Sequence, residues 1–316
     1  MRLITTDNPK VTILLATFNR AHLIIETLKS IQNQTYDNFE CLITDDNSAD
    51  DTEAVINKFI ETDDRFLYFK KPEKYPQGLS ASRNFGLDLA EKKKAQYIQF
   101  FDDDDIMHPQ KLELQISTLI KNNVDFVLCA SKRFTKNYEI SNEVKELYRF
   151  NNFADDYLVG KIHFGAPIPL FRFNYINRNR FDTALFYAEE WVCFTQLFYH
   201  YTPRVCLIDT ILFYQRKHDN SITLGKDIEL KKTKSSKVSG TILVNYLNKN
   251  GLHTLLSSRV FANIFLFKTR DERVLNEILS EIKSKNISKV LYFEIIFFRS
   301  ILKLQSKVFM KISSWI

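Results

Sequence analysis

Four consecutive aspartates, Asp102 to Asp105, have the clearest chemical potential in this 316-residue chain. They follow the apolar run YIQFF at 97–101, which has the composition of a buried strand. Adjacent carboxylates repel one another unless a cation neutralises them. Hard oxygen ligands suit Mg²⁺ or Mn²⁺ carried with a diphosphate. The alternative is an acidic solvated turn, but the position of the run directly after a strand favours a metal site.

Two other polar clusters have the same position relative to a predicted strand. Residues 17–20 (TFNR) follow the apolar run at 11–16, and residues 45–48 (DDNS) follow the run at 39–44. Ser48, Asp50 or Asp51 could cap a helix that begins near residue 52, which is the ordinary interpretation of such a cluster. Asp46 could still bind a base or a ribose hydroxyl, and the two roles are compatible.

The elements that must position these clusters alternate along the first hundred residues. Apolar runs predict strands at 11–16, 39–44, 65–69, 97–101, 124–130 and 205–216, and helical spacing predicts helices at 21–33, 49–60, 79–94, 110–122 and 187–199. This alternation indicates βαβ units and a mostly parallel sheet in an α/β fold. Ligands bind beyond the carboxyl ends of such strands, where all three clusters fall.

Composition and charge limit the classes of protein. Hydrophobic residues are 45% and charged residues 26%, which favours a sizeable core over disorder. Residues 226–316 hold 17 of the 44 basic and 7 of the 38 acidic residues, so the rest of the chain is slightly acidic. This asymmetry indicates that the C-terminal third meets an anionic partner. The four cysteines lack zinc spacing, and reduced buried thiols in the cytoplasm are expected.

No targeting or membrane-spanning segment is expected. The first ten residues are polar, without the apolar stretch of a signal peptide. No apolar run reaches the ~20 residues of a spanning helix. The pattern therefore predicts a soluble or peripheral protein.

Four segments together resemble the inverting family 2 glycosyltransferases, which have the GT-A fold. Residues 11–20 are similar to the opening strand and turn of that family, with Ala16 in place of the usual Pro and Phe18 in place of Tyr. Residues 43–52 resemble the uridine-binding segment, 78–90 the donor-side helix, and 99–112 the DxD metal motif. Each segment is weak evidence, but the ordered set, within about residues 9–222, is highly specific.

The resemblance implies a nucleotide-sugar site, with a UDP-sugar as the expected donor. Thr17 and Asn19 would lie in the nucleotide-binding first loop. Asp46 would accept hydrogen bonds from the uracil ring or neighbouring nucleotide atoms. Arg83 would face the donor.

The same resemblance implies roles in the acidic run and after the last strand. Asp104 would bind Mn²⁺ or Mg²⁺ directly, Asp102 would lie nearer the ribose and sugar, and Asp103 would also belong to the nucleotide-sugar site. Arg216 would neutralise the leaving group. His218 would complete the metal shell or touch phosphate, although a lone His in a polar loop is more often simply solvated.

A general base is expected at the start of the helix at 187–199. Glu190 matches the base position of the family, with Glu in place of the more common Asp. Glutamate can abstract a proton, and its extra methylene shifts the reach by about one bond. The alternative is that Glu189 and Glu190 are helix first-turn residues favoured by the macrodipole. Trp191 is either core packing or an acceptor contact that stacks on a sugar ring.

The C-terminal region is expected to be helical, with possible breaks near Gly240, Gly251 and Asn286. Basic residues recur every four positions near its end, and apolar residues including the terminal Trp315 fall mainly on complementary faces; the basic set is Arg299, Lys303, Lys307 and Lys311. This pattern suits an in-plane helix on an anionic membrane surface. The alternative is a helix packed on the rest of the chain or on a partner in a homodimer.

The sequence therefore predicts a GT-A catalytic domain at 1–225, with a donor-binding part at about 9–106 and an acceptor-side part at about 107–225, and a helical extension at 226–316. The expected reaction transfers a sugar to a hydroxyl of a glycan or lipid-linked glycan. Competing hypotheses are a nucleotidyltransferase, against which the missing Gly-rich phosphate loop argues, and a non-catalytic nucleotide-sugar-binding scaffold. No motif for binding nucleic acid is present, so no such partner is expected.

Overall fold

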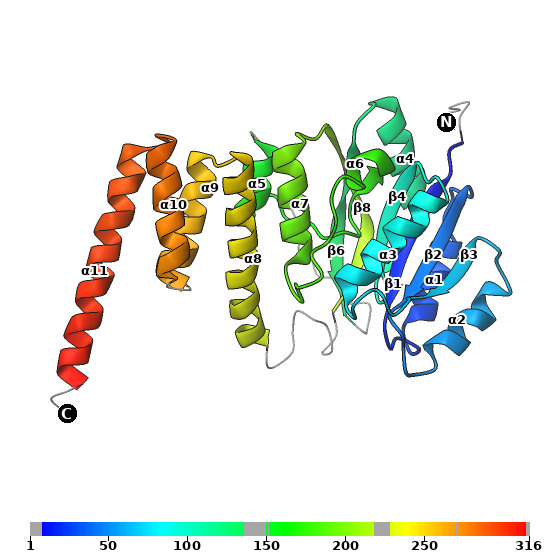
Figure 1. The fold of residues 1–316 in the computed structure, drawn as a ribbon. Helices are drawn as coiled ribbons and strands as arrows, with labels where there is room; N and C mark the ends of the chain where they lie inside the picture. The colour runs from blue at the N-terminus through cyan, green and yellow to red at the C-terminus, as the bar shows by residue number, and fades with distance from the viewer. Residues whose placement is uncertain (1–7, 136–149, 151, 218–227, 269–270, 314–316) are drawn as a thin grey trace.

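The structure is a computed structural model that describes residues 8–135, 150, 152–217, 228–268 and 271–313, except for the side chains of 228–236 and 303–313. A sheet with flanking helices forms one end of the molecule, and a row of helices extends from it (Figure 1). His218, a predicted site residue, lies outside the described residues.

An eight-stranded sheet forms the centre of the first part. Its strands follow one another in the order β3 (Phe66–Lys70), β2 (Phe39–Asp45), β1 (Val11–Thr17), β4 (Tyr97–Asp102), β7 (Leu170–Arg172), β6 (Phe126–Phe134), β8 (Val205–Arg216) and β5 (Ile106–Met107). The first four strands are parallel to one another, as are β6 and β8, whereas β7 and β5 run antiparallel to their neighbours. Every residue of β1 and β2 is buried, because helices cover both faces of a parallel sheet. The predicted mostly parallel sheet is confirmed.

The helices of the first half lie on the connections between these strands. They are α1 (Ile24–Gln32), α2 (Thr52–Ile60), α3 (Leu79–Lys92) and α4 (Lys111–Lys121). α1 shows why they form, since its buried residues Ile24, Thr27, Leu28 and Ile31 recur at helical spacing and face the sheet. The predicted helices all exist, with ends displaced by up to three residues.

The segment at 131–180, where the sequence predicts no helix or strand, contains the end of β6, α5 (Phe153–Leu158), β7 and α6 (Phe173–Ile176), and α7 (Glu189–His200) follows it. Its aromatic residues form part of the main core. Phe126 of β6 stacks on Phe198 of α7 with ring centroids 5.6 Å apart, and Phe153 meets the same ring edge-on. These contacts fix α7 against the sheet, and α7 carries the predicted base.

In the described residues of the C-terminal region there are four α-helices and a short π-helical segment. They are α8 (Ile228–Asn250), α9 (Leu255–Asn263), η1 (Ile264–Lys268), α10 (Glu272–Ser284) and α11 (Lys289–Ser313). Their apolar residues form a second hydrophobic cluster that also includes Leu158, Leu185 and Val192. The row of helices is therefore attached to α5 and α7, and α11 is the outermost (Figure 1). Among the described helices, none is both long enough and apolar enough to cross a membrane.

Two of the three predicted helix breaks are confirmed. Gly251 and Asn286 follow the ends of α8 and α10 and adopt positive φ angles of 68° and 48°. The break predicted at Gly240 is wrong, because α8 continues through it. A Cβ atom on Gly240 would lie 3.2 Å from the ring of Phe265. This glycine therefore allows close packing instead of ending the helix.

The cysteines agree with the prediction of reduced thiols. All four are free, and Cys41, Cys129 and Cys193 are buried.

Candidate active site

The three polar clusters meet at one edge of the sheet. β1 lies between β2 and β4, and in the register of these strands Thr17 is paired with Asp45 and Ala16 with Asp102. Because the three strands are parallel, their carboxyl ends form one edge. The prediction that these clusters share an edge is confirmed.

The loop after β1 is attached to both neighbouring clusters. The backbone amide of Asn19 donates to Ser48 Oγ at 2.9 Å, and the side-chain Oδ1 of Asn19 accepts from the amide of Ala49 at 2.8 Å. The amide of Phe18 donates to Asp103 Oδ2 at 3.2 Å. Thr17 is buried, and its carbonyl accepts from the amide of Asp46. The two predicted nucleotide-binding residues of this loop therefore also hold it in place.

Asp46 fixes the start of the helix that carries Arg83. It accepts a hydrogen bond from the amide of Gly78 at 2.7 Å. Gly78 precedes α3 with a φ of 129°, a conformation that only glycine adopts readily. Asp46 also forms an ion pair with Lys71, whose side chain is fully buried. Sequence reasoning missed Lys71, since a lysine after a strand carries no specific motif.

The acidic run divides into exposed and buried carboxylates. The side chains of Asp102 and Asp104 are 31% and 19% exposed, whereas that of Asp103 is 11% exposed and Asp105 is buried. Asp105 accepts from the amide of Arg216 at 2.7 Å. Asp102 and Asp104 are thus the two most exposed carboxylates of the run.

Burial raises the pKa of Asp103 and Asp105, the two least exposed aspartates of the run. It raises the pKa of Asp103 to about 7, with a further contribution from the negative charge of Asp104, while Arg20 opposes the shift. Burial also raises the pKa of Asp105 well above its usual value, and the other aspartates of the run add to this effect. Burial is therefore the main cause of both shifts, and the cations of the site offset only part of it.

Arg20, which sequence reasoning did not select, is one of these cations. Its Nε donates to Asp103 Oδ1 at 3.2 Å, and its Nη2 lies 3.6 Å from Asp104 Oδ2. Its position directly after the TFN turn was the available signal.

Arg216, at the end of β8, braces the main chain of the acidic run. Its Nε donates to the carbonyl of Asp104 at 2.8 Å, and its Nη2 pairs with Glu26 at 2.5 Å. The guanidinium group also lies over the ring of Phe134, 4.8 Å from its centroid. Arg216 is 8% exposed, so its described contacts hold the turn that contains Asp104.

Arg83 joins the donor side of the site to α7. The side chain is 3% exposed, and its Nη2 lies 2.9 Å from both Asp102 Oδ1 and Glu190 Oε1. Nη1 lies 3.0 Å from Glu189 Oε1. Burial opposes the charge of this arginine, but the three carboxylates outweigh that effect and raise its pKa. One guanidinium group therefore connects Asp102, the first aspartate of the acidic run, to the predicted base.

Glu190 has the electrostatic environment of a general base. Burial raises its pKa to about 7, and the negative charges of Glu189 and Asp102 add to the shift, while Arg83 opposes it. A carboxylate with a pKa near the operating pH is suited to accept a proton. The preceding Ala188 has a φ of 65°, a strained backbone conformation for a residue other than glycine.

Trp191 faces the interior between the two hydrophobic clusters. Its side chain packs against both of them, and its Nε1 donates to the carbonyl of Leu158 at 3.2 Å. These contacts correspond to the packing alternative considered for this residue.

The acidic residues fit a metal ion that arrives with its ligand. In the part of the chain that the structure describes, no group of three or more His, Cys, Asp or Glu side chains could hold a metal ion. Mg²⁺ is commonly bound by one or two carboxylates together with substrate phosphates and water. Asp104 with the neighbouring Asp102 supplies that kind of oxygen set, so these residues fit a metal–diphosphate pair rather than a permanent metal cage.

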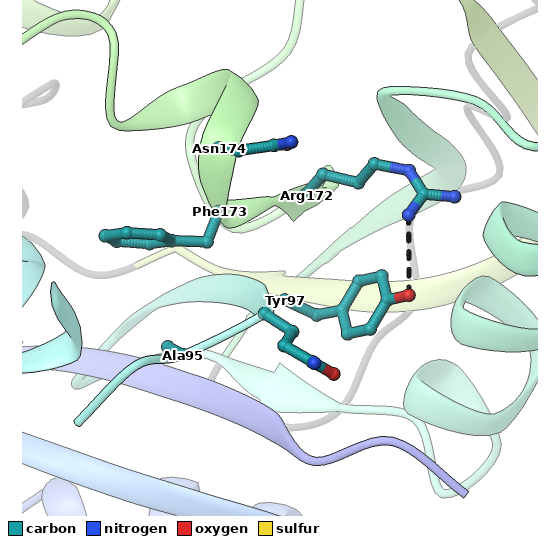
Figure 2. A pocket seen from close by; sticks show the side chains of 6 residues that line it. Ala95, Tyr97, Arg172, Phe173 and Asn174 are labelled. Carbon is teal, nitrogen blue, oxygen red and sulfur yellow. Dashed lines mark hydrogen bonds between the residues drawn. The ribbon is translucent and has the colours of Figure 1, made fainter. Parts of the chain in front are cut away.

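A shallow pocket of about 300 Å³ lies elsewhere, lined by Ala95, Gln96, Tyr97, Arg172, Phe173 and Asn174. Figure 2 shows the Arg172 guanidinium group above Tyr97, with a hydrogen bond of 3.5 Å between them. Tyr97 is the first residue of β4 and Asp102 is the last. The pocket is therefore at the opposite edge of the sheet from the acidic run.

Comparison with known proteins shows the relationships of the chain. Residues 12–179 match the family described as Glycosyl transferase family 2. A GalNAc(5)-diNAcBac-PP-undecaprenol beta-1,3-glucosyltransferase of Campylobacter jejuni is 30% identical over 69% of this chain and 68% of its own length. The UDP-Glc:alpha-D-GlcNAc-diphosphoundecaprenol beta-1,3-glucosyltransferase WfgD of Escherichia coli is 35% identical over 43% of this chain and 48% of its own length.

A solved structure shows the same fold. The crystal structure of residues 1–349 of S. aureus TarS in complex with UDP superimposes with a TM-score of 0.59. The two chains are 18% identical, and the match covers 94% of this chain and 91% of the other.

Proposed function

The chain belongs to Glycosyl transferase family 2 and is a glycosyltransferase with the GT-A fold, and we propose that sugar transfer inverts the configuration at the anomeric carbon. The observation that carries this proposal is Arg83, which holds Asp102 and Glu190 together in one buried ion cluster. The proposed donor residue Asp102 and the proposed base Glu190 are ion-paired to the same guanidinium group, and this supports a reaction that needs no separate enzyme nucleophile. The competing hypotheses of a nucleotidyltransferase and a non-catalytic scaffold do not fit the family.

The proposed reaction is a single displacement. Glu190 takes the proton of the acceptor hydroxyl while that oxygen attacks the anomeric carbon of the donor sugar. The bond from this carbon to the diphosphate oxygen breaks, and the nucleoside diphosphate leaves. Because attack occurs from the face opposite the leaving group, the configuration at the anomeric carbon inverts.

The donor side of the proposal uses the three strand ends. Thr17, Asn19 and Asp46 would line the nucleotide, while Asp102 and Asp103 would lie toward its sugar. We propose Asp104 as the ligand of Mn²⁺ or Mg²⁺, and a bound ion would stabilise negative charge on the leaving diphosphate. The adjacent carboxyl groups of the acidic run, of which Asp102 and Asp104 are partly exposed, support a role for a cation here.

Two arginines and one histidine complete the proposed site. Arg83 would face the donor while it stays ion-paired with its carboxylates. Arg216 would act on the site indirectly, by holding the turn that contains Asp104. His218 stays a proposal from the sequence, as a second metal ligand. Trp191 is not proposed as an acceptor contact, given its packing.

The substrates are proposed from the relatives. The Escherichia coli relative is named for a UDP-Glc donor, and both relatives are named for acceptors linked to undecaprenol through diphosphate. We propose a UDP-sugar donor and a glycan or lipid-linked glycan acceptor for this chain.

A membrane-facing role is proposed for the helical extension at 226–316. One face of α11 carries exposed apolar side chains, with Val290, Phe293, Phe297 and Ile301 at 67%, 65%, 61% and 36% exposure. The sequence after Glu294 contains four basic residues and no acidic one. An apolar face with basic flanks suits the surface of an anionic bilayer, where a lipid-linked acceptor would also lie. The alternative occupant of this face is a second copy of the chain.

A donor-hydrolysis screen tests the proposed function. UDP-, GDP- and dTDP-sugars are incubated with Mn²⁺ and the protein, and released nucleotide is measured, with Asp104→Ala as the control. Release from a UDP-sugar that the variant loses is the expected result. If no donor is hydrolysed and none binds in a metal-dependent way, the proposed donor site is wrong.

A further inference from the structure

A tight turn at 165–168, between α5 and β7, lies against the carboxylate of the proposed base. The amide of Ile168 donates to the carbonyl of Gly165 at 3.2 Å, which closes the turn. Hydrogen bonding from the Ala166 main chain lowers the pKa of the Glu190 carboxyl group. A Cβ atom on Gly165 would lie 3.1 Å from Glu190 Oε2. The turn therefore presents bare main chain to this carboxylate.

A buried lysine holds the same turn from behind. Lys111 of α4 has no exposed surface. Its Nζ donates to Ile168 O at 3.1 Å, Gln99 Oε1 at 2.8 Å and Gln115 Oε1 at 2.5 Å. All three acceptors belong to neutral groups.

The two glutamines also donate hydrogen bonds to carbonyl groups of the turn. Gln99 of β4 donates through Nε2 to Pro167 O at 2.8 Å. Gln115 of α4 donates through Nε2 to Ile168 O at 2.9 Å and to Val127 O of β6 at 2.8 Å. Both glutamines have no exposed surface. The carbonyls of two consecutive turn residues are thus fixed by three side chains from the sheet and α4.

The cost of this network indicates that its geometry matters. Burying an amine without a carboxylate partner is unfavourable, and burial lowers the pKa of Lys111 to about 8. An apolar residue of similar length would fill the same space without that cost. Fully satisfied polar networks of this kind fix one arrangement of the groups that they contact.

We propose that Lys111, with Gln99 and Gln115, is a positioning residue for the proposed base, acting through the turn at 165–168. The network holds the Ala166 amide against the Glu190 carboxylate, and the bare Gly165 leaves room for that carboxylate. This inference rests on the proposed role of Glu190, which is tested separately by the activity of Glu190→Gln.

The hydrogen bond from Ala166 has a defined consequence for Glu190. It favours the ionised carboxylate and so lowers the pKa of Glu190, as Arg83 does, against the raising effects of burial, Glu189 and Asp102. If the network is broken and the amide moves away, the pKa of Glu190 rises. This shift distinguishes positioning from a general loss of stability.

Thermal unfolding across pH measures this shift without a substrate. A pKa that is higher in the folded than in the unfolded state means that the folded protein binds more protons between the two values. The contribution of Glu190 to stability therefore falls as pH rises from about 4.5, and it levels off near the folded-state pKa of about 7. The difference in Tm between the protein and Glu190→Gln therefore grows with pH and then levels off. The measurement is repeated with Lys111→Met present in both proteins.

The levelling point is the pH at which the Tm difference between the protein and Glu190→Gln stops growing. The expected result is that Lys111→Met moves this levelling point upward by about half a pH unit or more. Gly165→Ala is the second variant, in case Lys111→Met does not fold, and it should give the same upward shift by displacing the carboxylate from the amide. Gly240→Ala is the matched control, since its added methyl meets Phe265 at 3.2 Å, far along the chain from the base. It should lower Tm and leave the levelling point unchanged.

Three results would overturn the inference. The levelling point could stay the same in Lys111→Met and Gly165→Ala, it could move equally in Gly240→Ala, or no pH-dependent difference between the protein and Glu190→Gln could be found. If Glu190→Gln retains sugar transfer, the base assignment fails, and the inference fails with it. If that variant is inactive while the levelling point does not move, the inference alone fails.

Discussion

Arg83 Nη2 lies 2.9 Å from Glu190 Oε1, and the same nitrogen lies 2.9 Å from Asp102 Oδ1. These two carboxylates come from α7 and β4, which are separated by almost ninety positions in the sequence. Because a buried guanidinium group holds both, displacement of either element alters the distance between the proposed base and the donor side.

Glu190→Gln should reduce sugar transfer by about 10²–10⁴-fold, the usual contribution of a general base. Glutamine has nearly the same shape but cannot accept the proton. Donor binding should change little, as measured by calorimetry with UDP and Mn²⁺. Near-normal turnover in this variant would show that another group is the base.

The rate of transfer should depend on pH through Glu190. Its pKa is raised to about 7, so the carboxyl group is protonated and inactive as a base at lower pH. The ratio kcat/KM should therefore fall about tenfold for each unit below pH 7 and level off above it. A flat profile between pH 5.5 and 8 would contradict the shift.

Arg83→Met should destabilise the protein by about 3–5 kcal/mol, because it leaves buried carboxylates without their cation. The free energy of unfolding in urea measures this loss. Lys70→Met is the control, because the Lys70–Glu53 pair of 3.5 Å is on the surface and is expected to contribute little. Equal effects of the two substitutions would mean that the Arg83 cluster is not a stabilising unit.

Asp104 and Asp105 are neighbours with different expected roles. Asp104→Ala should weaken UDP binding in the presence of Mn²⁺ by at least tenfold and remove its dependence on Mn²⁺. The protein should stay folded, since this side chain is the more accessible of the two. Asp105→Ala should lower Tm, because Asp105 holds the amide of Arg216. Titration calorimetry and thermal unfolding of both variants test the assignment, which is reversed if Asp105→Ala alone loses metal-dependent binding.

The apolar face of α11 should bind anionic vesicles. Full burial of a Phe side chain contributes about 1.5–3 kcal/mol, so Phe293→Ser with Phe297→Ser should weaken binding at least tenfold. Cosedimentation with phosphatidylglycerol-containing vesicles measures this, with phosphatidylcholine alone as the low-charge comparison. Val238→Ser, at a 44% exposed position on α8, is the control and should bind as the parent does.

Two outcomes would contradict the membrane assignment of α11. One is an absence of vesicle binding by the parent protein. The other is a dimer in solution that the double variant converts to a monomer, which would assign the face to a second copy of the chain.

Sequence patterns alone predicted most of the catalytic half. The runs at 11–16, 39–44 and 97–101 are apolar and short, and each ends in a polar cluster, so the parallel sheet and its functional edge followed from periodicity and from strand direction. Helix ends were displaced by a few residues, as capping positions are weakly specified. The segment at 131–180 could not be assigned, because its aromatic residues carry no clear period and acquire their places only by packing on α7 and β6.

What the sequence by itself determined is local: the strand ends that bring Thr17, Asp46 and the acidic run to one edge, and the free thiols. The tertiary structure decided which side chains meet across long separations, because such contacts depend on packing rather than on spacing. It paired Arg83 with Glu189 and Glu190, buried Lys71 against Asp46 and turned Trp191 inward. It also placed Lys111 behind the turn that touches the proposed base, which no motif could indicate.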